Sequence, residues 1–325
     1  MSGTSTTFLV GIPTYKRPDD LNICLTTLFQ DLGSRRNVRV CVVNDASHDD
    51  AYEQVVSKFD ERLEYVVLDE NSGPGIARHN AFVDASEDYL VGIDDDCIVP
   101  EGWFSWIEAN VIANEHTDIF VGWTEPVWSQ KPSIWDRLTT VPCTYPEPVF
   151  TQQGLLTAVG ANVVFKREAY QRSGGYSASM RGAVEDCWLS QQILNTGGNY
   201  KLLVEAKMGH NAKNGLRTLW RRYHWYGYGG AQFAIMEQNW QLVEVCSNKS
   251  FSSILDNLRG NIRNEWKAKH HSPGLSIKRV AYTLSTIVWT TAYEVGWAKG
   301  VKKYEKEYSL ELPSRPKLKD RYINF

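Results

Sequence analysis

The sequence has no pair of cysteines separated by two residues, an absence that bears on both metal binding and redox compartment. Six cysteines are scattered along the 325 residues, at positions 24, 41, 97, 143, 187 and 246. Zinc sites and disulfide frameworks usually show closely and regularly spaced cysteines. We therefore expect reduced thiols in a cytoplasmic protein, and no zinc bound by cysteine.

The sequence also lacks a strong net charge and a recognisable leader. A formal net charge of -3 provides no overall attraction to nucleic acid. The first ten residues, MSGTSTTFLV, contain neither a basic segment nor a long apolar segment, so we expect no signal peptide. An apolar content of 42% and a charged content of 22% are ordinary for a soluble globular protein.

No apolar run is clearly long enough to cross a bilayer. The nearest is VAYTLSTIVWTTAY, from Val280 to Tyr293, which contains five serines and threonines. Its uncharged length is short for a membrane span and typical of a buried helix. We expect a packed helix here, and peripheral contact with a membrane surface is the alternative.

The first third of the chain alternates between strand and helix patterns. Apolar runs predict strands at 6–12, 38–45, 63–69 and 88–93, and helical periodicity predicts helices at 19–32, 49–59 and 73–85. Such alternation predicts parallel βαβ units in an α/β fold. Ligands of these sheets bind beyond the carboxyl ends of the strands.

The rest of the chain is organised differently. Five of the twelve prolines lie between Pro126 and Pro148, which predicts a long irregular excursion over 126–150. Strand and helix patterns return at 156–170, 184–197 and 199–206, and the chain is mostly helical from about Asn214. We expect one domain over 1–212 and a C-terminal helical region over 213–325.

Acidic residues follow the predicted strands at the edge where a ligand would bind. Asp94, Asp95 and Asp96 come directly after strand 88–93, and Asp45 ends strand 38–45. A solvated loop is the ordinary explanation of an acidic triplet, but this position argues against it. Converging carboxylates that bring no cysteine or histidine ligand of their own suit Mg²⁺ or Mn²⁺, ions that take few protein ligands and complete their coordination with phosphate oxygens. The pattern indicates a diphosphate ligand.

Six motifs along the chain together resemble one family. In order, they are IPTYKRPDDL, VVNDASHDD, NSGPGIARHNA, IDDDC, VGANVVFKRE and EDCWLSQQI. Each is a weak pattern, but their order and spacing over roughly 6–212 are similar to those of family 2 glycosyltransferases. The resemblance implies a GT-A fold, which is Rossmann-like with a mostly parallel central sheet and helices on both faces.

The resemblance also implies roles on the donor side. Asp45 would accept a hydrogen bond from the base, Tyr15 and Arg17 would line the base pocket, and Arg78 would contact nucleotide oxygens. Asp94 and Asp95 would lie near the ribose, and Asp96 would bind the Mn²⁺ or Mg²⁺ ion between the two phosphates. The full nucleotide-binding set is Pro13, Thr14, Tyr15, Arg17, Asp45, Arg78, Asp94 and Asp95. Arg78 as a plain surface residue is the alternative.

On the acceptor side, the resemblance makes Asp186 the general base and Glu185 a residue that orients or binds the acceptor. Direct displacement with this base inverts the anomeric carbon. Acids at a helix N-terminus are stabilising anyway, so a structural role is the alternative for this pair. His210 resembles a histidine that completes the metal site in several relatives. A purely structural role for His210 is an equally weighted alternative.

The resemblance names substrates only by class. The donor would be a nucleotide sugar, with UDP expected because it is the commonest nucleotide of the family. The acceptor stays open among saccharide, lipid-linked glycan, peptide, natural product and modified nucleobase. The segment LWRRYHWYGYGG, 219–230, departs from the Gln-x-x-Arg-Trp motif of processive members, which argues against a polymerising synthase.

Two other functions are weighed against glycosyl transfer. A nucleotidyltransferase needs a glycine-rich loop bearing Arg or Lys after its first strand to bind a triphosphate. The segment GIPTYKRP has proline where such a loop needs glycine, which argues against this function. A non-catalytic nucleotide-sugar-binding protein is disfavoured by the intact acidic pairs.

Overall fold

The computed structural model describes residues 6–128, 131–132, 158, 160–180, 183–211, 215–236, 258–260, 262 and 277–307. They fall into two compact units. The first unit holds the described residues up to Asn211 except Ala183 and Val184, and the second holds those two and the described residues from Gly215 onward. Most of the predicted excursion over 126–150 lies outside the described residues, and the prediction is wrong at its start, where Pro126 and Val127 belong to a strand.

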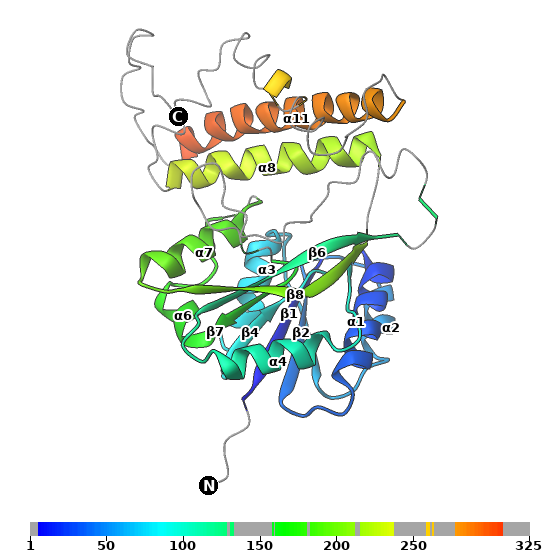
Figure 1. Ribbon diagram of the computed structural model, residues 1–325, viewed down its shortest axis with the longest axis vertical. Coiled ribbons are helices and arrows are strands. Elements are labelled where there is room, and N and C mark those ends of the chain that lie inside the picture. Colours follow the sequence, from blue (N-terminus) through cyan, green and yellow to red (C-terminus); the bar gives the residue numbers. More distant parts are fainter. Residues whose placement is uncertain are drawn as a thin grey trace. The chain divides into compact units, whose positions relative to one another are not determined.

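The first unit is built on a mixed sheet (Figure 1). The strand order is β3-β2-β1-β4-β7-β6-β8-β5. The bounds are β1 Phe8–Thr14, β2 Val38–Asn44, β3 Leu63–Val67, β4 Tyr89–Gly92, β5 Cys97–Ile98, β6 Ile119–Val127, β7 Val163–Lys166 and β8 Tyr200–Asn211. Strands β3, β2, β1 and β4 pair in parallel, as predicted, whereas β7 is antiparallel to both of its neighbours.

The helices of this unit are α1 Pro18–Leu32, α2 Ala51–Val56, α3 Pro74–Phe82, α4 Trp103–Ala113, α6 Arg167–Arg172 and α7 Glu185–Asn195. Helix α1 shows why the sequence forms them. Pro18 opens the helix, where its missing N–H costs nothing, and two aspartates in the first turn are favourable near the positive end of the dipole. Its buried residues Leu21, Leu25 and Leu28 recur at helical spacing and cover the sheet.

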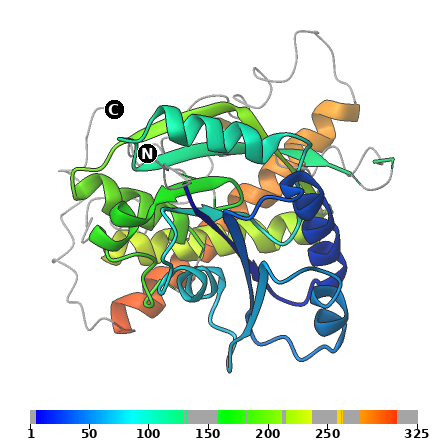
Figure 2. The same ribbon diagram turned by 90° about the horizontal axis from the view of Figure 1, so that it is seen from below.

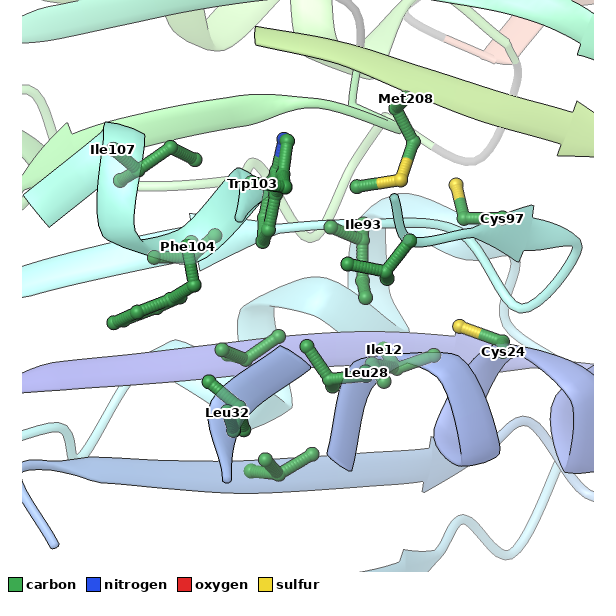
Figure 3. Close-up of a cluster of buried hydrophobic side chains, with 14 of the residues drawn as sticks. Ile12, Cys24, Leu28, Leu32, Ile93, Cys97, Trp103, Phe104, Ile107 and Met208 are labelled. Atoms are coloured by element: carbon green, nitrogen blue, oxygen red, sulfur yellow. The ribbon is translucent and has the colours of Figure 1, made fainter. Parts of the chain in front are cut away.

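The core lies on both faces of the sheet. Successive side chains of β1 alternate between faces, so that Phe8, Val10 and Ile12 join one cluster and Leu9 joins the other. The first cluster contains residues of α1, α2 and α4, and the second contains residues of α3, α6 and α7. Figure 3 shows part of the first cluster, including Ile12, Leu28 and Trp103. Because β1 is buried on both faces, its sequence is apolar almost throughout.

The second unit contains two long helices, α8 Leu216–Met236 and α11 Ile277–Glu307, which pack along each other (Figures 1 and 2). Glycines allow this approach. A Cβ on Gly227 would clash with the Tyr293 carbonyl oxygen, and one on Gly296 would clash with that of His224. The aromatic and glycine-rich 219–230 segment is therefore a helix-packing surface. No helix in the described part of the chain has the length and apolar character needed to cross a membrane.

Candidate active site

The loop after β1 is tied to the acidic triplet. Thr14 is buried, and its hydroxyl donates to Asp95 Oδ2 over 2.8 Å. Lys16 has a positive φ of 54°, and after this turn Arg17 Nη1 lies 3.1 Å from Asp95 Oδ1 and 2.9 Å from Asp96 Oδ2. The loop therefore supplies a fixed cation beside two of the three aspartates.

The other predicted residues of this loop differ in exposure. Pro13 is buried within β1, paired in register with Val43 of β2. Tyr15 is 38% exposed, and the Lys16 ammonium lies 4.9 Å from its ring centroid. The Tyr15 ring is accessible for stacking on a flat ligand.

Asp45 holds the loop that leads into α3. Its Oδ2 accepts from Asn71 Nδ2 over 2.8 Å and from the Gly73 N–H over 2.9 Å, and its Oδ1 accepts from the Ser72 N–H over 2.7 Å. Gly73 has a φ of 93°, which suits glycine alone among ordinary residues. A carboxylate has about four acceptor positions, so Asp45 can accept a further donor at Oδ1.

Asp94, Asp96 and His210 converge on one point. Their ligand atoms all lie within 4.8 Å of one another, and His210 Nε2 is 3.1 Å from Asp96 Oδ1. The pairing of β5 with β8 sets this geometry, since Cys97 is opposite His210 and the Asn211 N–H donates to the Asp96 carbonyl over 2.8 Å. Two carboxylates and an imidazole are a donor set that fits Mn²⁺, and Mg²⁺ through the carboxylates.

Arg78 is a buried arginine between the two acidic groups of the site. Its side chain is 4% exposed, and its terminal nitrogens donate to Asp94 and to Glu185 in two ion pairs. Glycine makes room for the guanidinium, because a Cβ on Gly160 would lie 2.7 Å from Arg78 Cζ. The sequence motif VGANVVFKRE contains this glycine, but the pattern alone gave it no function.

The Glu185–Asp186 pair begins α7. Glu185 is 6% exposed, whereas Asp186 is half-buried. Asp186 Oδ2 accepts from the Gly160 N–H over 3.1 Å, and its Oδ1 accepts from the Cys187 N–H over 2.8 Å. The preceding residue, Val184, has a φ of 71°, a strained conformation for a β-branched residue. The strained residue lies directly before the Glu185–Asp186 pair.

Burial governs the pKa values of both acids. Burial raises the pKa of Glu185, against the opposing effect of Arg78, and the nearby charge of Asp186 adds to the rise. Burial also raises the pKa of Asp186, while Arg78 and the N–H groups of Gly160 and Cys187 oppose it. A carboxylate whose pKa lies closer to neutrality is a better proton acceptor at working pH.

The structure thus brings most of the predicted residues into one connected group. Asp94 links the metal cluster to Arg78, and Arg78 links it to Glu185 and so to Asp186. Asp95 faces Thr14 and Arg17 instead. The ligand roles predicted for these residues stay predictions.

The comparisons with known proteins agree with this geometry. The family model of glycosyl transferase family 2 matches residues 9–174, just over half of the chain. The chain belongs to glycosyl transferase family 2. It is therefore a glycosyltransferase, and its fold is the GT-A fold that the motifs implied.

Solved structures of similar fold include two glycosyltransferases. TarS of S. aureus, residues 1–349, is 13% identical with a TM-score of 0.52, and the match covers 93% of this chain and 92% of that one. The mannosyltransferase PcManGT from Pyrobaculum calidifontis, in complex with GDP-Man and Mn²⁺, is 16% identical with a TM-score of 0.51, covering 94% and 76%. No curated protein sequence matches the chain.

The Gly160 contact leads to a first testable expectation. In Gly160→Ala the new Cβ would displace the Arg78 guanidinium, since 2.7 Å is shorter than any ordinary contact. We expect the free energy of unfolding to fall by about 1–3 kcal/mol, as for other overpacked sites, together with loss of transfer activity. Urea unfolding and a donor-consumption assay measure both effects.

Gly260→Ala is the control, because a Cβ there meets no atom of the described residues within 4 Å. This variant should match the wild type in activity and equal or slightly exceed it in stability. Wild-type stability and activity in Gly160→Ala would show that Arg78 is not held as described.

Proposed function

We propose that this glycosyltransferase moves a sugar from a nucleoside diphosphate sugar, with a UDP-sugar expected, to an acceptor hydroxyl in a metal-dependent reaction. The observation that carries the proposal is the convergence of Asp94, Asp96 and His210 at the sheet edge, within one network with Asp186. TarS has been solved with UDP-GlcNAc and with UDP, and PcManGT with GDP-Man and Mn²⁺. These fold relatives support a nucleotide sugar as donor.

Asp96 and His210 would hold Mn²⁺ or Mg²⁺, with Asp94 within reach of the same ion. A bound divalent ion stabilises the negative charge that grows on a departing nucleoside diphosphate. Arg17 already offsets the charges of Asp95 and Asp96 on the opposite side. The carboxylates can therefore lie close together before the donor arrives.

The nucleoside would bind at the ends of β1 and β2. Tyr15 presents an accessible ring for the base, and Asp45 keeps an acceptor position for a base N–H. Pro13 and Thr14 would line the base pocket beside Tyr15 and Asp45. Asp95 acts mainly by holding Thr14 and Arg17 in place.

Asp186 would accept the proton of the acceptor hydroxyl as its oxygen attacks the anomeric carbon. Its two backbone hydrogen bonds fix the carboxylate while leaving acceptor positions open. Direct displacement by this path inverts the anomeric configuration. The acceptor is open among saccharide, lipid-linked glycan, peptide, natural product and modified nucleobase.

Ligand-induced stabilisation tests the proposal directly. We expect UDP with Mn²⁺ to raise the melting temperature by several degrees, because a ligand at 100 times its Kd stabilises the folded state by about 2.7 kcal/mol. GDP and dTDP with Mn²⁺ complete the panel, and UDP with a chelator is the control. The panel is repeated with Mg²⁺, and if no nucleoside diphosphate shifts the melting temperature with either metal, the proposal fails.

A donor panel then identifies the sugar. The protein is incubated with UDP-, GDP- and dTDP-sugars and Mn²⁺, and the released nucleoside diphosphate is measured.

A further inference from the structure

We infer that Arg78 is a positioning residue that ties Asp94 on the donor side to the start of α7, where Asp186 lies, through its ion pair with Glu185. The inference rests on the proposed function and assigns Arg78 and Glu185 roles other than ligand contact. Arg78 then acts by holding Asp94 and the start of α7 in place without touching the substrates, and Glu185 is its counter-ion.

The contacts support a bridge better than a ligand site. One terminal nitrogen of Arg78 donates to Asp94 and the other to Glu185, so both ends of the guanidinium are already engaged. At 4% exposure the side chain offers almost no surface to a nucleotide. The three residues come from α3, the loop after β4 and α7, which lie far apart in the sequence.

The surroundings are shaped around this bridge. Gly160 leaves room for the guanidinium, and its N–H donates to Asp186 Oδ2 over 3.1 Å. Gly75 leaves room for Glu185, since a Cβ there would lie 3.0 Å from Glu185 Cβ. A single displacement of Arg78 would therefore disturb the backbone that supports Asp186.

Stability alone does not explain a buried group of this kind. Removing charges from water is costly, and buried ion pairs are often no more stabilising than apolar residues of the same volume. Two buried polar atoms here, Arg78 Nε and the hydroxyl of nearby Tyr176, have no hydrogen-bond partner among the described residues. An arrangement that is costly for folding and sits between two reactive groups points to a role in function.

Arg78 also sets the charge balance around Asp186. Among the described residues, the titratable groups that face Asp186 are Arg78 from α3, Glu185 from its own helix, Asp94 after β4 and Tyr176 after α6. Arg78 is the positive member of this set. Its loss should make Asp186 harder to ionise, whereas loss of the Glu185 charge should make it easier.

The test compares Arg78→Gln, Arg78→Lys and Glu185→Gln by calorimetry with UDP and Mn²⁺ and by pH profiles of kcat/KM. In Arg78→Gln the acidic limb of the kcat/KM profile, where activity is lost as the pH falls, should move to higher pH by about 1–3 units, the effect of losing a close opposite charge. The maximal rate should fall by about 10²-fold, as expected for a displaced reacting group. Arg78→Lys should restore the limb but only part of the rate, because an ammonium cannot span both carboxylates.

Glu185→Gln should move the acidic limb downward and leave UDP affinity within about twofold, as a group outside the nucleotide site would. Arg39→Gln is the control, because Arg39 also bridges two carboxylates, those of Glu64 and Glu87, but lies near the start of β2, at the opposite end of that strand from Asp45. Arg39→Gln should lower the free energy of unfolding, because two ion pairs are lost, and should leave the pH profile of kcat/KM unchanged.

An acidic limb that stays in place in Arg78→Gln, with a rate like that of Arg39→Gln, would overturn the inference. If Arg78→Gln does not fold, the limbs of Arg78→Lys and Glu185→Gln decide: a wild-type limb and rate in both would also overturn it. Failure of the proposed function looks different, because the wild type itself would then neither bind UDP with Mn²⁺ nor release nucleoside diphosphate from any donor.

Discussion

Asp96→Ala is expected to abolish metal-dependent donor binding, so that calorimetry with UDP and Mn²⁺ detects no binding. Asp96 is 5% exposed and lies 3.1 Å from His210 on one side and 2.9 Å from Arg17 on the other. Its removal takes away one of the two carboxylates of the cluster, and only the Asp94 carboxylate and the His210 imidazole then remain to bind the ion together with the diphosphate. Transfer activity should be lost with the binding.

His210→Ala should have a smaller effect of the same sign. An oxygen-preferring cation keeps Asp94 and Asp96, so we expect Mn²⁺ affinity to fall by about 10- to 100-fold, as for loss of a supporting partner. A Mn²⁺ titration of donor hydrolysis measures the change. A wild-type titration in His210→Ala, together with failure of Asp96→Ala, would show that the histidine only supports the fold.

Asp88→Ala is the matched control for the aspartate. Asp88 precedes β4 at its opposite end and accepts from the Thr7 N–H and hydroxyl over 2.9 Å each. Its replacement should lower stability without changing Mn²⁺ dependence. Wild-type UDP affinity with Mn²⁺ in Asp96→Ala would place the ion elsewhere or make it unnecessary.

The sequence predicted the parallel half of the sheet well because its signals are local. Apolar runs such as FLVGI and VRVCVV end in polar residues at the same edge, and the rule for parallel strands then brings Thr14, Asp45 and Asp94 together. Helix α1 was predicted to within one residue of its start for the same reason. Its leucine spacing and opening acids lie within one segment.

Contacts between distant segments were harder to predict. Strand β5 has only two residues, too few for a periodic signal, yet its pairing with β8 sets His210 beside Asp96. The ion pairs of Arg78 join it to Asp94, 16 positions away in the sequence, and to Glu185, 107 positions away. A helix-start pattern shows an arginine near an anion-binding end, but it does not show which carboxylates enclose the side chain.

Asp186→Asn is expected to lower the transfer rate by about 10²- to 10⁴-fold, the usual contribution of a general base, while UDP affinity with Mn²⁺ stays within about twofold. The amide keeps the size of the side chain but cannot accept the proton of the acceptor hydroxyl. Steady-state kinetics and calorimetry separate the two effects. Glu168→Gln, another acid in the first turn of a helix but an exposed one, is the matched control and should behave as the wild type.

The pH dependence gives the second half of this prediction. Asp186 accepts a proton only when it is ionised, and burial raises its pKa above the ordinary aspartate value. Wild-type activity should therefore be lost as the pH falls through a value higher than that of a solvated aspartate, about 3.9. The residual activity of Asp186→Asn should lack this acidic limb, since no carboxylate remains there to titrate. A limb of unchanged position in Asp186→Asn would assign it to another group, with Glu185 the first to examine because burial raises its pKa as well.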